Sequence, residues 1–193
     1  MSRPNDYLLV VPEGWFRIDL MPGDREPAIA RLVDLQFSGI DNAPHLKRQA
    51  RDSLLRTAQN AYGNGGIEMY VSLQTAAGFP LAASLVVTLT PPHENDAVSV
   101  PPERLAQSLA GNGAEVTVIT FTGGPAVRVR RRTEPSSESR SGYRSPVTNL
   151  EIHTPVPDSS AYLILSFSTP LAPLADAMVG LFDTIAGTLR WIP

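Results

Sequence analysis

The strongest local concentration of charge in the sequence lies in the stretch AVRVRRRTEPSSESRSGYR, residues 126–144. Residues 128–144 hold six arginines against two glutamates, a local charge of +4, whereas the whole chain carries −3 and the remainder therefore −7. Arg128, Arg130 and Arg132 alternate with other residues, so a strand here would place three guanidinium groups on one face. Because guanidinium groups bind carboxylates through two parallel hydrogen bonds, this pattern favours a site for an acidic partner. The alternative is the solvated side of a half-buried hairpin, which explains the same alternation.

The loop beyond this strand extends the predicted contact surface. Its Ser-rich run at 134–142 has the composition of a mobile loop. Nucleic acid is the less favoured partner, because the chain is acidic overall and Tyr143 is the single aromatic residue near the arginines. We therefore expect another protein with an acidic surface. The predicted contact residues are Arg128, Arg130, Arg132, Arg140, Tyr143 and Arg144.

The sequence contains no pattern typical of a catalytic or metal site. His45, His93 and His153 have no histidine or carboxylate at ligand spacing, and the chain has no cysteine. No serine occupies a nucleophile elbow. The Gly-rich runs GNGGIE and GNGAEV each follow a predicted helix and precede a strand, which is the reverse of the order in a phosphate loop. We therefore predict no catalytic, cofactor-binding or metal-binding residue and no cofactor.

Four helices are predicted from apolar residues that recur at helical spacing. Two early helices span about residues 24–39 and 43–62, a short one follows near 104–110, and a long final helix covers about 172–190. The apolar stripe of the final helix is wide enough to pack on a sheet. We expect Leu181 and Phe182 to be buried against that sheet.

The strands are predicted from alternation of apolar and polar residues. The opening residues 7–20 favour a hairpin around the turn PEG, and GIEMYVSLQT pairs with PLAASLVVTLTP in a second hairpin. Two further hairpins join AEVTVITF to AVRVRRRT and TNLEIHTPV to SAYLILSFS. Clean alternation in GIEMYVSLQT predicts a sheet with one solvated side. The fold class is therefore α+β: an α/β/α sandwich in one domain, residues 1–193, with a mainly antiparallel sheet of about six to eight strands.

The two ends of the chain resemble a known fold family. The opening LLVVPEGWFRI and the ending AYLILSFSTPLAPLADAMVGLFDTIAGTLRW are similar to the first hairpin and the last strand and helix of PsbP-like proteins. That group includes the Ran-binding Mog-type proteins and mycobacterial lipoproteins of the LpqN kind, and the chain looks like an actinobacterial member. The resemblance implies the α/β/α sandwich and a role in binding proteins without catalysis. It transfers no functional residue.

These observations lead to a functional hypothesis with one alternative. We expect a non-enzymatic protein-binding or adaptor protein of the cytoplasm, because no apolar run has the 18 residues of a membrane span and no secretion signal is visible. The alternative is a small-molecule binding protein, or a hydrolase without a recognisable motif, with a pocket between the sheet and a helix. A pocket that gathers polar groups with shifted pKa values would favour the alternative.

Overall fold

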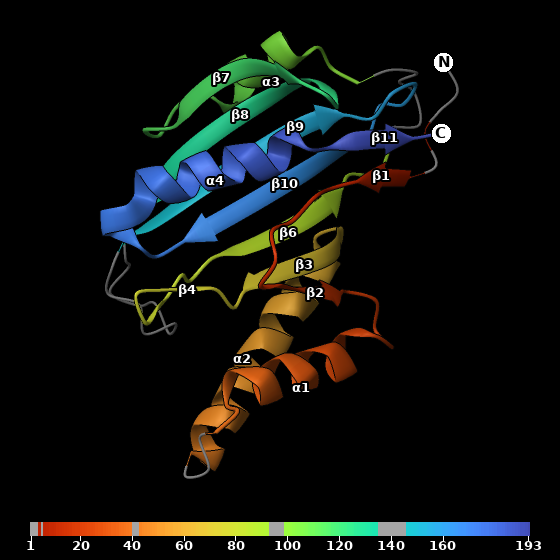
Figure 1. Ribbon diagram of the computed structural model, residues 1–193. Helices are drawn as coiled ribbons and strands as arrows, with labels where there is room; N and C mark the ends of the chain where they lie inside the picture. Colours follow the sequence, from red (N-terminus) through yellow and green to blue (C-terminus); the bar gives the residue numbers. More distant parts are fainter. Residues whose placement is uncertain (1–3, 5, 40–42, 93–98, 135–145) are drawn as a thin grey trace.

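The fold is built on a seven-stranded sheet in which every neighbouring pair is antiparallel. The computed structural model describes residues 4, 6–39, 43–92, 99–134 and 146–193. The strand order is β2-β3-β6-β10-β9-β8-β7 (Figure 1). The strands are β2 Trp15–Asp19, β3 Gly66–Ser72, β6 Ser84–Leu89, β7 Glu115–Phe121, β8 Gly124–Thr133, β9 Val147–Pro155 and β10 Tyr162–Thr169.

One face of the sheet packs on the final helix, α4 (Ala175–Gly187), which follows a single 3-10 turn at Ala172–Leu174. The ring of Phe182 stacks on Phe167 of β10 with centroids 4.8 Å apart. Phe182 has no exposed surface, as predicted, whereas Leu181 is only partly buried. The fully buried side chains on this face include Leu85, Val87, Leu150, Ile152, Leu163, Leu165 and Phe167.

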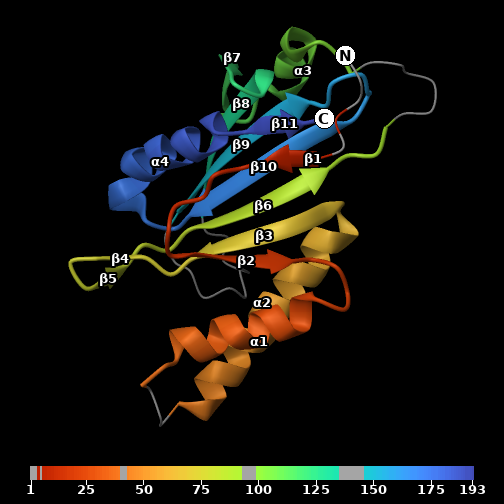
Figure 2. The ribbon, with the colours of Figure 1, turned by 45° about the vertical axis from the view of Figure 1, so that its right-hand side comes forward.

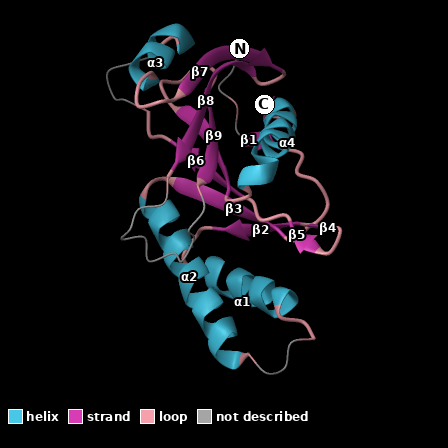
Figure 3. Ribbon diagram, turned by 90° about the vertical axis from the view of Figure 1, so that its left-hand side faces the viewer, coloured by secondary structure: helices cyan, strands magenta, loops and turns pink. Residues whose placement is uncertain are grey.

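The opposite face is covered at its two ends by the other helices (Figure 3). Helices α1 (Arg25–Gln36) and α2 (Pro44–Gly63) pack at the β2 and β3 end, and α3 (Pro102–Leu109) packs on β7 and β8. The core between α1, α2 and the sheet consists of Ile18, Leu20, Ala28, Ile29, Leu32, Val33, Ala58 and Met69. The predicted α+β class, with a mainly antiparallel sheet between helices, is confirmed.

The predicted opening hairpin is wrong. Its first strand, β1 (Asp6–Leu8), pairs with β11 (Arg190–Ile192) at the other end of the chain, while β2 pairs with β3 (Figure 2). The partly buried side chains of Leu9 and Val11 pack on the α4 core, which draws the segment before β2 across that face. The three other predicted hairpins are present as β3–β6, β7–β8 and β9–β10.

The end of the final helix also differs from the prediction. Helix α4 stops at Gly187, and Trp191 belongs to β11. Its indole Nε1 donates to the Gly123 carbonyl oxygen at 2.8 Å, so the residue ties the C-terminal strand to the β7–β8 turn. The link between β3 and β6 contains a further small pair, β4 (Thr75–Ala76) with β5 (Phe79–Pro80), which alternation over such short segments could not predict.

The prediction that β3 has a solvated side is wrong as well. Glu68, Tyr70 and Ser72 are the polar positions of the GIEMYVSLQT alternation and were expected on the solvated side. They have at most 9% of their surface exposed, whereas Ile67 is 38% exposed. Both faces of β3 are covered because α4, β1 and β11 lie on one side of the sheet and α1 and α2 on the other (Figures 1 and 3). Burial of a glutamate follows from this arrangement.

Candidate functional site

Strand β8 places the predicted arginine ladder on the face that carries α4. Arg128 and Arg130 lie opposite Ile152 and Leu150 of β9, which belong to the α4 core. Arg128 makes a bidentate pair with Asp183 of α4, with Nε to Oδ1 at 2.8 Å and Nη2 to Oδ2 at 3.0 Å. These hydrogen bonds, ahead of the opposing effect of burial, raise the pKa of Arg128. The first arginine of the ladder therefore holds a helix of its own chain.

The other arginines of the predicted site differ in their partners. Arg130 donates to Asp176 of α4 at 2.6 Å, and Arg132, whose side chain is 64% exposed, donates to Glu134 at 3.1 Å. The three guanidinium groups share one strand face as predicted, but β8 is not an edge strand, because β7 lies outside it. Three predicted contact residues, Arg140, Tyr143 and Arg144, and most of the predicted loop at 134–142 lie outside the described residues.

Arg131 lies within β8, and its side chain projects from the face opposite to that of Arg128 and Arg130. Its guanidinium donates to Glu151 of β9 at 3.3 Å and to the Leu109 carbonyl oxygen of α3 at 3.2 Å. His153 Nε2 lies 3.1 Å from the same carboxylate. The hydrogen bond with His153 and the charge of Arg131 hold the pKa of Glu151 below its ordinary value, against the effect of burial. The cluster anchors α3 to the sheet.

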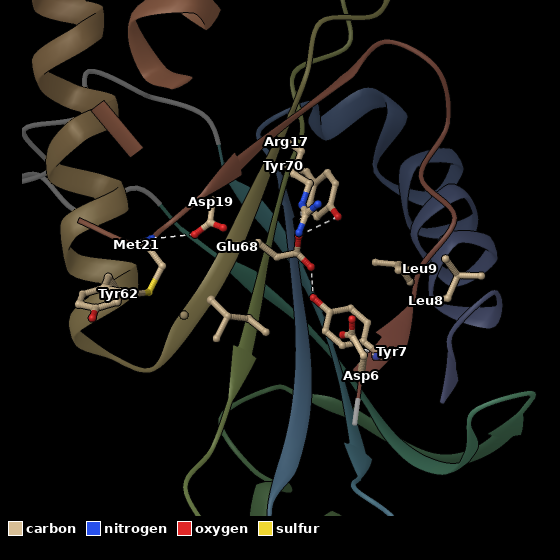
Figure 4. A pocket seen from close by; sticks show the side chains of 12 residues that line it. Asp6, Tyr7, Leu8, Leu9, Arg17, Asp19, Met21, Tyr62, Glu68 and Tyr70 are labelled. Carbon is tan, nitrogen blue, oxygen red and sulfur yellow. Dashed lines mark hydrogen bonds and ion pairs between the residues drawn. The ribbon is translucent and has the colours of Figure 1, made fainter. Parts of the chain in front are cut away.

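A pocket of about 410 Å³ lies at the other end of the sheet from β7 and β8, between β1, strands β2 and β3, and the end of α2 (Figure 4). Gly66 lets the end of α2 approach β3 closely, since a Cβ at this position would lie 2.7 Å from the Ala61 carbonyl oxygen. The polar lining comes from all three sides. It consists of Asp6 and Tyr7 on β1, Arg17 and Asp19 on β2, Tyr62 at the end of α2, and Glu68 and Tyr70 on β3.

Glu68 is the centre of the pocket's hydrogen bonds. Its carboxylate accepts from the Tyr7 hydroxyl, from Arg17 Nε and, at 3.0 Å, from the Tyr70 hydroxyl. Burial and the nearby charge of Asp6 raise the pKa of Glu68, and the bond from Tyr70 partly opposes them. Burial also raises the pKa of Tyr70, together with the charge of Glu68. The carboxylate therefore joins three strands at one buried point.

This arrangement can bind a ligand through hydrogen bonds and charge. Asp6, Asp19 and Glu68 outnumber Arg17, so the lining favours a cationic group. In the part of the chain that the structure describes, no set of three or more histidine, cysteine, aspartate or glutamate residues could hold a metal ion. No local pattern in the sequence indicates the pocket, because Glu68 stands at a polar position of an alternating strand and Tyr7 reaches it from a segment 61 residues away.

The outer surface of α2 is a second feature that no motif in the sequence indicates. Of its 20 residues only Ala58 is buried. Apolar contacts to the core come from one side, through Ala50, Leu54, Leu55 and Ala61. Figures 1 and 3 show α1 and α2 extending beyond β2, away from α4, as a helical arm. The first turns of α2 are exposed throughout, residues 44–49.

Similarity to known proteins was found among solved structures only. No protein-family model matches the chain, and no curated protein matches it. Among solved structures, the crystal structure of the Saccharomyces cerevisiae Ran-binding protein Mog1p is similar over 99% of this chain and 97% of that one, at 13% identity and a TM-score of 0.45. The solution structure of the cyanobacterial PsbP of Synechocystis is similar over 98% of this chain and 91% of that one, at 13% identity and a TM-score of 0.34.

Proposed function

We propose that the protein acts by binding another protein, without catalysis, and that the helical arm of α1 and α2 is its contact surface. One observation carries the proposal: α2 is a 20-residue helix that buries a single residue in the fold of its own chain. Most of the stability of a helix in a protein comes from packing of its apolar face, so a long helix held along one side presents the rest of its surface to a partner. Exposed Leu35 and Leu46 add apolar area to the arm.

A photo-crosslinking experiment tests this proposal. The chain has no cysteine, so Gln49→Cys and Ser53→Cys each create a unique attachment point on the exposed side of α2. Gln107→Cys on α3 is the matched control, because Gln107 is also exposed and lies on another helix. After attachment of a photoreactive group and illumination in cell extract, we expect one protein adduct of defined mass from the arm positions and not from the control. Adducts from neither arm position, or equal adducts from all three, would overturn the proposal.

The arginine stretch on β8 stays a predicted contact surface within this proposal. Arg128 and Arg130 already hold carboxylates of α4, which leaves Arg132 as the more exposed of the ladder arginines. Arg140, Tyr143 and Arg144 remain predicted contacts on the same grounds of composition. A cytoplasmic location also stays a prediction. No helix in the described ranges is long and apolar enough to cross a membrane.

The pocket around Glu68 supports a second candidate function, the binding of a small cationic molecule. The observation that favours it is the convergence of Tyr7, Arg17 and Tyr70 on one buried carboxylate within a cavity of about 410 Å³. A nuclear magnetic resonance titration with small amines and guanidines tests it. Saturable shifts confined to the amides that line the pocket would support this function, and their absence at every ligand concentration would refute it.

A further inference from the structure

Helix α2 carries a positive charge that differs in sign from the rest of the protein. Lys47, Arg48, Arg51 and Arg56 stand against Asp52, which gives the helix +3. Because the whole chain carries −3, all other residues together carry −6. A positive surface on an acidic protein attracts negative groups at the arm and repels them elsewhere.

Three arginines of α2 form no ion pair with any carboxylate in the part of the chain that the structure describes. Lys47 pairs with Asp34 of α1 at 2.6 Å, but no ion pair joins Arg48, Arg51 or Arg56 to any residue that the structure describes. The arginines of β8 are different, since Arg128, Arg130, Arg131 and Arg132 each reach an aspartate or glutamate. Carboxylates of another molecule can therefore bind the α2 arginines without displacing a partner among the described residues.

The positions of these arginines suit a chain of carboxylates. Arg48 and Arg56 are eight residues apart, close to two helical turns, so they project from the same side of α2. Together with His45, Gln49 and Asp52 they line a surface hollow of about 350 Å³. Arg48 also borders a second hollow of about 330 Å³, towards α1, with Arg51. Each guanidinium group can hold a carboxylate with two hydrogen bonds.

The chemistry of this surface favours a protein over other polyanions. Asp52 lies between Arg48 and Arg56 and would repel an evenly charged phosphate backbone, and the remaining −6 of the chain would do the same at longer range. The hollow of Arg48 and Arg56 has no phenylalanine, tyrosine or tryptophan in its lining, so nucleic-acid bases lack the large rings on which they usually stack. A protein segment can place carboxylates beside the arginines and a donor beside Asp52.

We propose that α2 docks an acidic segment of a partner protein, whose carboxylates bind Arg48, Arg51 and Arg56. This inference rests on the proposed protein-binding function and gives its partner a chemistry. Arg48 and Arg51 hold the segment at the hollow of about 330 Å³ beside α1, and Arg56 extends the contact along the outer side of α2.

The test is a binding titration with a charge-reversed variant and a matched control. The double variant Arg48→Glu/Arg56→Glu is compared with Arg104→Glu/Arg190→Glu, which changes net charge equally at exposed arginines off the arm. The probe is a fluorescent peptide of Glu, Asp and Ala, with its Gln and Asn counterpart as a neutral reference. We expect the arm variant to lose about tenfold or more in affinity at low salt, while the control stays near wild type.

Three outcomes would overturn the inference: equal losses in both double variants, equal binding of the neutral peptide, or tighter arm-dependent binding of a DNA duplex or of phosphatidylserine vesicles. Circular dichroism verifies the fold, and Arg48→Gln/Arg56→Gln repeats the test without new repulsion from Asp52. The crosslinking experiment keeps the two proposals separate. A partner that crosslinks at Ser53→Cys but binds the charge-reversed arm normally would refute the acidic segment and leave protein binding intact.

Discussion

The ion pair between Arg128 on β8 and Asp183 on α4 tests what the arginine strand contributes to the fold. Its two hydrogen bonds measure 2.8 and 3.0 Å, and the exposed fractions of the two side chains are 18% and 38%. Fully exposed pairs contribute about 0.2–1 kcal/mol, and a hydrogen bond to a charged group contributes about 1.5–3 kcal/mol when it is shielded from water. The intermediate exposure of this pair therefore predicts a coupling free energy of about 1–2 kcal/mol.

A double-mutant cycle with Arg128→Met and Asp183→Asn measures this coupling. Met keeps most of the apolar stem of arginine, and Asn keeps the shape of aspartate, so each single change removes the charge interaction with little change in packing. Urea unfolding followed by circular dichroism gives the free energy of unfolding of each variant, provided that the slope with urea is constant. The pair Arg132–Glu134, exposed at 64% and 70%, is the control and should couple by less than about 0.5 kcal/mol.

The two pairs must differ for the interpretation to hold. If Arg128 and Asp183 couple no more strongly than Arg132 and Glu134, the apolar face of α4 alone holds the helix on the sheet. The ladder arginines would then be free to serve a partner, and their assignment to the support of α4 would be wrong. A coupling that persists at high salt, where the control coupling fades, would show that the Arg128 pair is shielded from solvent.

Three further predictions follow from the same contacts. Phe182→Ala should lower the free energy of unfolding by about 3–5 kcal/mol, measured in urea, because the ring is fully buried and stacks on Phe167. Burial raises the pKa of Glu68 above its ordinary 4.5, so the folded state holds the proton at pH values where the unfolded state has lost it. The stability of the wild type relative to Glu68→Gln should therefore fall as the pH rises from 4.5 through the pKa of the folded state, measured by thermal unfolding at a series of pH values. Replacement of Arg128, Arg130 and Arg132 by Gln should lower the association rate with an acidic partner and make that rate less dependent on salt, measured with the partner immobilised on a surface at low and high salt. An unchanged association rate would show that these arginines serve only the fold.

The sequence predicted those parts of the fold whose signals are local. Alternation located β3, β6, β7, β8, β9 and β10, and short turns joined them into hairpins whose pairing is antiparallel by necessity. The stripe of α4 predicted a buried Phe182 because helical spacing alone brings its members to one face. Period and turn chemistry act over a few residues, so these inferences needed no knowledge of distant contacts.

The pocket needed contacts that no local pattern contains. Tyr7 reaches Glu68 only because β1 leaves its neighbour β2 and pairs with β11 at the far end of the chain. An alternating strand such as β3 indicates which residues share a face, but not which face is covered by another element. The alternation therefore predicted that the side chain of Glu68 is exposed to solvent, whereas the structure buries it beneath β1.

A cluster of basic residues in the sequence is not the same as a cluster of unpaired positive charges on the folded surface, and the two lie at different places in this protein. The described part of the most basic stretch of the sequence lies on β8, where hydrogen-bonded aspartates and glutamates neutralise Arg128, Arg130, Arg131 and Arg132 within the fold. The basic residues of α2 are spaced more widely along the chain, yet Arg48, Arg51 and Arg56 keep no such partner among the described residues. An acidic partner binds more readily to unpaired guanidinium groups, because a guanidinium already bound to a carboxylate must first break that ion pair. The arm therefore attracts an acidic segment more strongly than Arg128 and Arg130 do, even though the sequence points to β8.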